Sequence, residues 1–369
     1  MDLLLQLVAF LTIFLSSIIP SVSSAENKLQ HEETPPVQEA VLLTKACSSS
    51  TSKEQCYAEK FYDLSLKHTL SYSIQTLDKL KEVDRAAMYC HGYAHEITSA
   101  QVIKNPEEWL KLFSQINPDA CTRGYFHGII QGHLSNQPSF TFTNKSMHEV
   151  CNAFLEEKRG FEAQKLQKTC AHTVGHMILV EKKADASDAI AVCKTFTEDL
   201  DYDCYSGVFM ENMNKDTLMD HGLADKYPWT EENTAEQEAV CKNYTSGPAS
   251  ACYESLGHMY AFISGNDNLR LLRLCSSAIT GADQEKCYLS GIGFMAYFMF
   301  QNKDEKEPVP LFCEPYDNDE ERYKKCLKFL ARYIIVSDRS LRVPVENQCE
   351  KIEIKERKAA CLQSARNVR

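Results

Sequence analysis

The chain has 369 residues, 16 cysteines and a formal net charge of −11 at pH 7. An acidic balance of this size opposes nonspecific binding to nucleic acid or to an anionic membrane surface. The cysteine count is even, and the close C-x-x-C pairs of zinc and thioredoxin-type sites are missing from the sequence. This usage predicts disulfides in an exported protein.

Residues 1–25 are predicted to be a secretory signal peptide. An apolar core is followed by a proline and by small residues suited to cleavage at Ser23 and Ala25. The apolar run is short for a membrane span, and an uncleaved anchor is the alternative. We therefore expect a secreted protein, extracellular or in the lumen of the secretory pathway, with no membrane segment after cleavage. Sequons at Asn144 and Asn243 predict a glycoprotein.

The rest of the chain predicts an all-α fold. Residues 26–45 are polar and proline-bearing, and we expect a flexible lead-in there. From Tyr57 onward, apolar residues recur at three- and four-residue intervals, and no useful alternating strand pattern occurs. We expect an N-terminal helical region with a histidine cluster over residues 46–190, followed by cysteine-paired helical repeats over residues 191–369. The architecture is predicted to be solenoid-like helix hairpins, with a more compact N-terminal half as an alternative.

Short cysteine pairs form a ladder along the chain. In each pair the first cysteine ends one helix and the second opens the next, so a bridge would tie repeat to repeat. Closing a loop of about a dozen residues stabilises by about 3 kcal/mol in the chain-entropy model. The pairing of Cys90 with Cys121 is left open. The predicted pairs are Cys47/Cys56, Cys193/Cys204, Cys241/Cys252, Cys275/Cys287, Cys313/Cys326 and Cys349/Cys361.

The run from Ala251 to Cys275 resembles the SLR repeat, a suppressor-of-lin-like relative of the tetratricopeptide repeat. The resemblance is best over residues 193–361, partial for the repeats opening at Cys204 and Cys287, and poor before Cys170. It implies stacked helix pairs, cysteine staples between repeats, and a concave surface that binds a protein or peptide partner. The residues that match the pattern A-x4-L-G-x2-Y and its glycine turn are Ala251, Leu256, Gly257, Tyr260 and Gly265.

Histidines recur at helical spacing after the second cysteine of several pairs. His91 and His95 stand four residues apart, as do His172 and His176, which places each pair on one helix face. Such a face suits two imidazoles on one ion, and neighbouring helices could complete a site for zinc, copper or iron. His127, His176 and His258 each follow such a cysteine by six residues. The predicted ligands are His91, His95, His127, His172, His176 and His258.

Two acidic residues stand beside this histidine register. Glu96, and also Glu211, could add a carboxylate ligand or act as a general base near metal-bound water. The candidate catalytic residues are Glu96 and His127. The sequence contains no H-E-x-x-H, no G-x-S-x-G and no P-loop motif, which excludes the commonest protease, esterase and nucleotide-binding signatures.

Two functions follow from these patterns. In the first, a histidine-lined groove binds a transition metal, and the protein is a metal carrier or a hydrolytic or oxidative metalloenzyme acting on a small-molecule substrate. In the second, the protein is a non-enzymatic scaffold for a protein or peptide, and the histidines only pack. Glycines at Gly92, Gly124 and Gly207 suit the second function, because they suggest close helix contacts.

Overall fold

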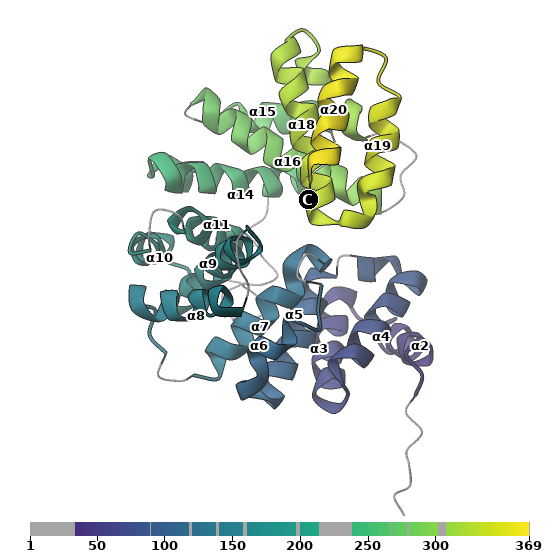
Figure 1. Cartoon of the computed structure of the whole chain (residues 1–369), viewed down its shortest axis with the longest axis vertical. Coiled ribbons are helices and arrows are strands. Elements are labelled where there is room, and N and C mark those ends of the chain that lie inside the picture. Colours follow the sequence, from purple (N-terminus) through teal and green to yellow (C-terminus); the bar gives the residue numbers. More distant parts are fainter. Residues whose placement is uncertain are drawn as a thin grey trace, which may run out of the picture.

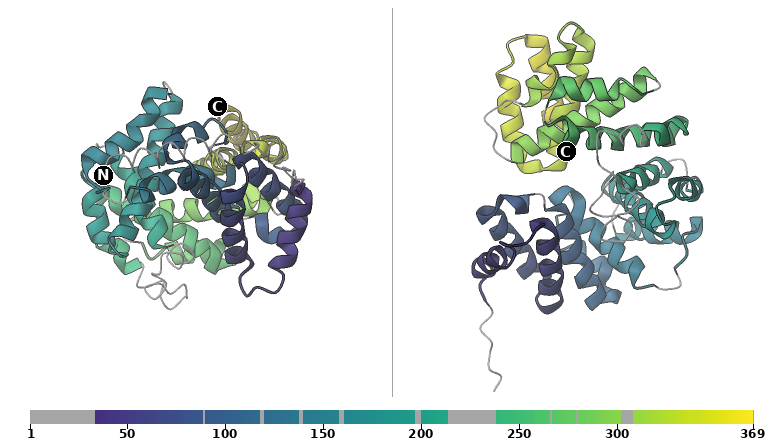
Figure 2. Two further views of the ribbon diagram at one scale, coloured as in Figure 1. Left: turned by 90° about the horizontal axis from the view of Figure 1, so that it is seen from below. Right: turned by 180° about the vertical axis from the view of Figure 1, so that it is seen from behind.

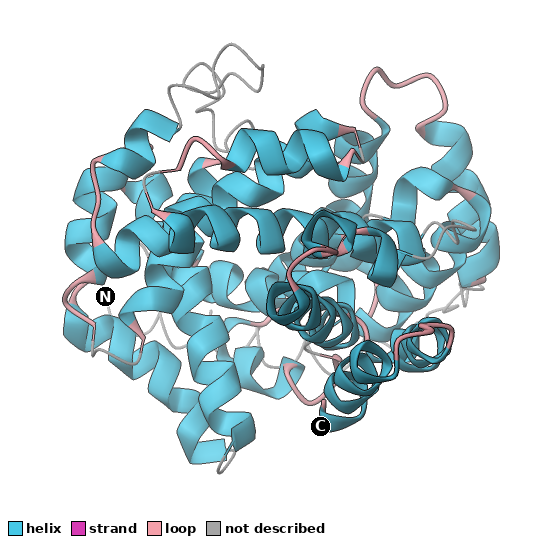
Figure 3. Cartoon of the chain, turned by 90° about the horizontal axis from the view of Figure 1, so that it is seen from above, coloured by secondary structure: helices cyan, strands magenta, loops and turns pink. Residues whose placement is uncertain are grey.

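The fold is described from a computed structural model of the chain. The regular elements among the described residues are all helices, so the predicted all-α fold is confirmed (Figure 3). None of the described helices is long and apolar enough to cross a membrane. The predicted signal peptide lies outside the described residues. These are 34–368 without 89, 118–119, 138–139, 158–160, 197–199, 214–237, 266, 279 and 302–307.

Most of the long helices form one continuous row, which we call the main row. Each helix of the main row contacts the next member of the row, so the row runs continuously from α3 to α20. The row turns as it proceeds, and α14 to α20 come to lie above α3 to α7 (Figures 1 and 2). Its members are α3 (Lys53–Lys67), α5 (His91–Lys104), α7 (Gly124–Ser135), α9 (Phe161–Glu181), α11 (Asp201–Asn212), α14 (Ser246–Ser264), α16 (Gly281–Gln301), α18 (Glu320–Ser337) and α20 (Lys355–Asn367).

A second set of helices alternates with the main row along the chain and packs beside it. The pairs α8 with α9, α10 with α11 and α15 with α16 show the hairpin arrangement that the cysteine ladder predicts. These helices are α2 (Pro36–Ala46), α4 (Leu70–Val83), α6 (Trp109–Leu112), α8 (Asn144–Glu157), α10 (Ala186–Cys193), α15 (Asn268–Cys275), α17 (Pro308–Leu311) and α19 (Arg342–Glu350). Short 3-10 turns span Arg85–Met88, Pro106–Glu108, Ala120–Arg123, Glu314–Tyr316 and Arg339–Leu341.

All sixteen cysteines are paired in disulfides, and the six predicted pairs are confirmed. Together with Cys151–Cys170, which joins the middle of α8 to α9, these bridges are local: they span at most 19 residues and each ties a segment to the next main-row helix. Cys90–Cys121 differs, because it spans 31 residues and joins the starts of two main-row helices, α5 and α7. Closing a loop of that length corresponds to about 3–4 kcal/mol in the chain-entropy model.

The structure differs from the expectation of a flexible lead-in over residues 36–45. These residues belong to α2, which contacts α4 and buries Ala40 and Leu43 against it. The cause is local, since Pro36 occupies the first helical position, where the lack of an N–H costs nothing, and the two buried residues stand three apart. The proline pair therefore marks a helix start here.

The buried apolar core divides into two clusters that meet at α7. Phe126 belongs to a large cluster that continues to the C-terminal helix, whereas Ile129 on the same helix belongs to an N-terminal cluster with Tyr57 and Phe61. The large cluster contains residues on both sides of position 190, where the sequence predicts the boundary between the N-terminal helical region and the cysteine-paired repeats. Helix α7 is consequently packed on both sides, and its residue His127 is buried.

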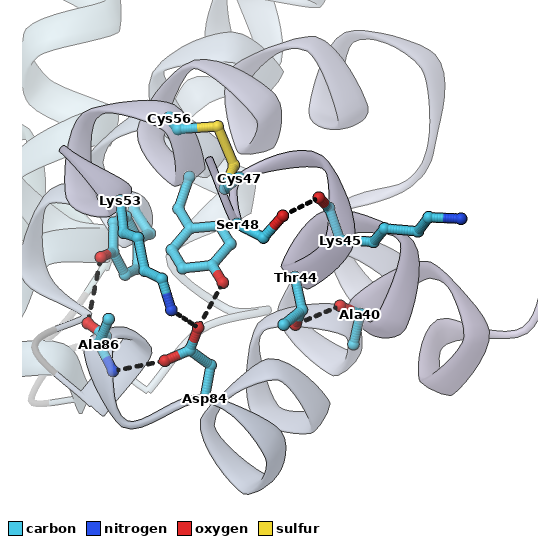
Figure 4. A network of polar contacts seen from close by, with 11 residues as sticks. Ala40, Thr44, Lys45, Cys47, Ser48, Lys53, Cys56, Asp84 and Ala86 are labelled. Carbon is cyan, nitrogen blue, oxygen red and sulfur yellow. Dashed lines mark hydrogen bonds and ion pairs between the residues drawn. A yellow bond between two sulfur atoms is a disulfide. The ribbon is translucent and has the colours of Figure 1, made fainter. Parts of the chain in front are cut away.

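Asp84 joins the start of α3 to the end of α4 (Figure 4). Its Oδ2 accepts hydrogen bonds from Nζ of Lys53 at 2.9 Å and from the hydroxyl of Tyr57 at 2.7 Å. Its Oδ1 accepts one from the backbone N–H of Ala86 at 2.9 Å. Burial acts to raise the pKa of Asp84, but these hydrogen bonds outweigh it and hold the pKa below its ordinary value. Burial and the bond to Asp84 raise the pKa of Tyr57 to about 12.

Replacing this carboxylate should produce a pH-dependent loss of stability. Asp84→Asn should lower the free energy of unfolding by about 2 kcal/mol near neutral pH, because hydrogen bonds to a charged group are lost. The folded-state pKa is depressed, so the stabilisation is complete above about pH 4 and disappears as the pH falls through the folded-state value. Urea denaturation at several pH values should show the difference between wild type and variant shrinking below about pH 4.

Asp78→Asn is the matched control on α4. Asp78 pairs with Lys81 on the surface, where its side chain is 56% exposed, so its removal should change stability by less than about 1 kcal/mol. A difference between wild type and Asp84→Asn that stays constant down to pH 2 would contradict the assignment of Asp84 as the ionised centre of this junction.

Candidate metal centre

Close backbone contact between neighbouring main-row helices builds the site. On α7, a Cβ at Gly124 would overlap the carbonyl oxygen of His91, and a Cβ at Gly128 would overlap that of His95. The two glycines stand four residues apart and so share the face of α7 that lies on α5. Between α9 and α11, a Cβ at Gly207 would likewise overlap the carbonyl oxygen of His172. The glycines thus lie directly over the turns that carry the histidines.

Five of the six predicted histidines come together across three main-row helices. His91 and His95 come from α5, His127 from α7, and His172 and His176 from α9. The ring of His127 is central, because its centroid lies 5.1 Å and 5.3 Å from those of the α5 pair. It lies 5.5 Å and 5.4 Å from the centroids of the α9 pair. Within the pairs, the centroids are 4.9 Å apart on α5 and 4.8 Å apart on α9.

Three of these residues form a set that could hold one metal ion. His91, His95 and His127 each offer a ring nitrogen, and the three nitrogens lie within 4.8 Å of one another. A tetrahedral zinc site with bonds of about 2.0–2.1 Å requires nitrogens about 3.3 Å apart, so modest side-chain movement would complete the geometry. Three imidazole ligands suit copper and iron as well.

The outer nitrogens of the surrounding rings are hydrogen-bonded away from the centre. Nδ1 of His91 lies 3.2 Å from the carbonyl oxygen of Cys121, and Nδ1 of His95 lies 2.8 Å from Oε1 of Gln131. Nδ1 of His176 lies 2.8 Å from Oε2 of Glu211, a carboxylate on α11. Partners of this kind fix the Nδ1–H tautomer and direct the lone pair of Nε2 inward, as is usual for histidines that bind metals.

His127 has no such partner. It is 2% exposed, and within the described part of the chain neither of its ring nitrogens makes a hydrogen bond. Burial, followed by the four neighbouring histidines, holds the pKa of His127 well below its ordinary value, and burial does the same for His172. The lowered pKa values of His127 and His172 favour the neutral ring, which is the form that binds metal ions.

The sixth predicted ligand, His258, lies elsewhere. His258 is on α14, where its ring contacts Phe294 at a centroid distance of 5.2 Å and its Nε2 lies 3.5 Å from the hydroxyl of Tyr333. Burial lowers the pKa of His258. Glu96 is a half-buried residue of α5, next to His95 in the chain. The carboxylate that the structure places at the histidines is Glu211.

Sequence reasoning missed one participant, Gln131. Its position four residues after His127 places it on the same face of α7, and that spacing is the signal that could have identified it. Of the glycines expected to mark close contacts, Gly124 and Gly207 do so. Gly92 does not, since a Cβ there would meet nothing within 4 Å.

Comparison with known proteins identifies no relative, since no family model, no curated protein and no solved structure matches the chain. The resemblance to the SLR repeat accordingly stays a prediction. Asn243 is exposed, as a glycosylation acceptor must be, and its modification also stays a prediction.

A methyl group at the α5–α7 crossing should disrupt the site without changing any histidine. Gly128→Ala places Cβ against the carbonyl oxygen of His95 and the hydroxyl of Thr98, so the helices must separate. We expect a loss of about 1–3 kcal/mol in the free energy of unfolding, as for other overpacked cores. Binding of zinc to the metal-free protein, followed by calorimetry, should weaken at least tenfold.

Gly92→Ala is the control for this substitution, because the position is open and lies on the same pair of helices. Alanine there should preserve metal binding and should stabilise α5 by up to about 1 kcal/mol through its higher helix propensity. Equal behaviour of the two variants would show that the close crossing at Gly128 does not position the histidines.

Proposed function

We propose that this is a secreted, disulfide-stapled helical repeat protein that binds a transition metal ion through His91, His95 and His127. The all-helical architecture with eight disulfides fits a protein of the secretory pathway. The proximity of the three ring nitrogens fits a metal site. The acidic net charge also suits a cationic ligand.

The unpartnered ring of His127 is the observation that carries the proposal. A buried polar group without a hydrogen bond costs about 1–3 kcal/mol, and most buried groups avoid that cost. A histidine that served only to pack would be expected to bond to a carbonyl, as His91 does. A metal ion bound to His127 would replace the missing partner, and the neighbouring imidazoles would share the ion.

The ligand set favours zinc, copper or iron over harder cations. Imidazole nitrogen suits these three metals, whereas magnesium and calcium prefer oxygen ligands. Three protein ligands leave a fourth position for water or substrate, which is the arrangement of catalytic zinc sites. Hydrolytic or oxidative activity on a small molecule is therefore the enzymatic form of the proposal, with Glu96 as the first candidate general base and His127 as a residue that touches the reacting centre.

The alternative is a non-enzymatic scaffold that binds a protein or peptide. The resemblance of residues 193–361 to SLR repeats supports it, because stacked helix pairs commonly present extended binding surfaces. The scaffold function explains the cysteine ladder and requires no functional role for the histidines. The metal function explains in addition why five histidines meet at one place. On that ground we favour the metal function.

Metal content decides between these functions. Mature protein secreted by its own host, desalted and digested, should contain near-stoichiometric zinc, copper or iron by mass spectrometry. His127→Gln should lose most of that metal, because the replacement removes a central ligand while remaining polar and of similar size. Melting temperature and disulfide content would show that the variant is folded.

His133→Gln is the matched control on the same helix. His133 stacks on Trp109 with ring centroids 3.9 Å apart and lies outside the five-histidine cluster. Its replacement should leave the metal content unchanged. A correctly oxidised wild-type protein that is metal-free, and that binds none of the three metals on titration, would overturn the metal function and favour the scaffold.

A further inference from the structure

His172 and His176 face each other through their Nε2 atoms, a contact in which the tautomers decide whether one ring donates to the other. Their Nε2 atoms are 3.1 Å apart. Oε2 of Glu211 accepts a hydrogen bond from Nδ1 of His176, and His172 makes a hydrogen bond with the backbone of Asp203 on α11. When both rings keep their protons on these outer sides, two nitrogen lone pairs point at each other. A cation between or beside the two atoms would turn that repulsion into attraction.

The spacing of these two nitrogens matches a pair of ligands on one ion. In a tetrahedral zinc site with bonds of about 2.0–2.1 Å, two ligand nitrogens are about 3.3 Å apart and the centres of their rings are about 5.2 Å apart. The observed values for the α9 pair are 3.1 Å between nitrogens and 4.8 Å between centroids. Both distances in the α9 pair are thus within about 0.4 Å of those expected for two histidines on one zinc ion.

The ring of His127 also lies against the α9 pair, whereas the three nitrogens that come within 4.8 Å of one another are those of His91, His95 and His127. Its ring centroid lies 5.5 Å from that of His172 and 5.4 Å from that of His176, again near the value of about 5.2 Å for rings on one ion. It contacts both pairs, and both of its nitrogens are buried and without a hydrogen bond. A single ion would use one of these nitrogens and leave the other unsatisfied.

We infer that the five histidines bind two transition metal ions, one at His91 and His95 and the other at His172 and His176, bridged by the ring of His127. This inference rests on the proposed metal function and extends it to a dinuclear centre. One ion takes the lone pair of the neutral His127 ring. The second replaces the ring N–H proton, which leaves to solvent, so that His127 bridges as an imidazolate. Metals joined in this way are roughly 6 Å apart when each bond is about 2.0–2.1 Å.

Glu211 supplies the charge that a second cation needs in a buried place. The residue is 1% exposed, one oxygen accepts the His176 proton, and the other has no hydrogen-bond partner. A buried carboxylate is costly unless a positive charge compensates it. An ion on Nε2 of His176 would provide that charge through the imidazole, in the carboxylate–histidine–metal arrangement common in metalloproteins.

Counting the ions tests the inference. Full-length mature protein is stripped with a chelator, its disulfides are verified, and zinc is added in excess before desalting and measurement by mass spectrometry. Wild type should retain two zinc ions per chain. His176→Gln and, as a second variant, His172→Gln should each retain one, with unchanged disulfide content and circular dichroism. His133→Gln should retain two.

The outcomes separate the inference from the proposed function. One tightly bound ion in wild type, unchanged in His176→Gln, would overturn the second site and leave the His91, His95 and His127 site intact. No bound ion in any protein would overturn both. Two ions in wild type and one in each α9 variant would support the dinuclear centre.

Copper tests the bridge itself. With two equivalents of Cu²⁺, spins coupled through an imidazolate should reduce the isolated Cu²⁺ signal in electron paramagnetic resonance well below that expected for two independent ions. His176→Gln with one equivalent should show an ordinary, uncoupled signal. Two full-intensity, uncoupled signals in wild type would overturn the bridging role of His127.

Discussion

The contact between the backbones of α5 and α7 is the constraint on which the site depends. Helices in globular proteins usually pack with axes 8–10 Å apart, which leaves room for long side chains between them. Gly124 and Gly128 have no side chains to keep the helices apart, so α5 and α7 touch through main-chain atoms. This close approach brings the ring of His127 to within 5.1 Å and 5.3 Å of the rings of His91 and His95. Gly207 repeats the arrangement between α9 and α11.

Much of this organisation could be predicted from periodic features of the sequence. The spacing of four residues predicted that His91 and His95 share a face, and the same holds for the pair on α9. Cysteines separated by about a dozen residues predicted the local disulfides, because such loops can only close between the end of one helix and the start of the next. His127 follows Cys121 by six residues, and the structure places it beside the histidine pairs of α5 and α9.

Other features depended on how the helices stack, which local spacing does not contain. His258 satisfies the same register rule, yet its helix lies further along the row and its ring meets Phe294. Glu96 and Glu211 were equivalent by sequence, but only Glu211 is on a helix that packs against the α9 pair. The helical state of residues 36–45 depended on burial against α4, a tertiary effect that outweighs a polar composition with two prolines.

The position of His91 depends on whether the Cys90–Cys121 disulfide is formed. One half-cystine directly precedes His91, and the carbonyl of the other accepts the hydrogen bond of that ring. None of the proposed ligands is a thiolate, yet a thiol reductant would loosen the first site by freeing the starts of both helices. Formation of this disulfide would then precede any metal binding at the first site, because the bridge holds the starts of the two helices that carry its ligands.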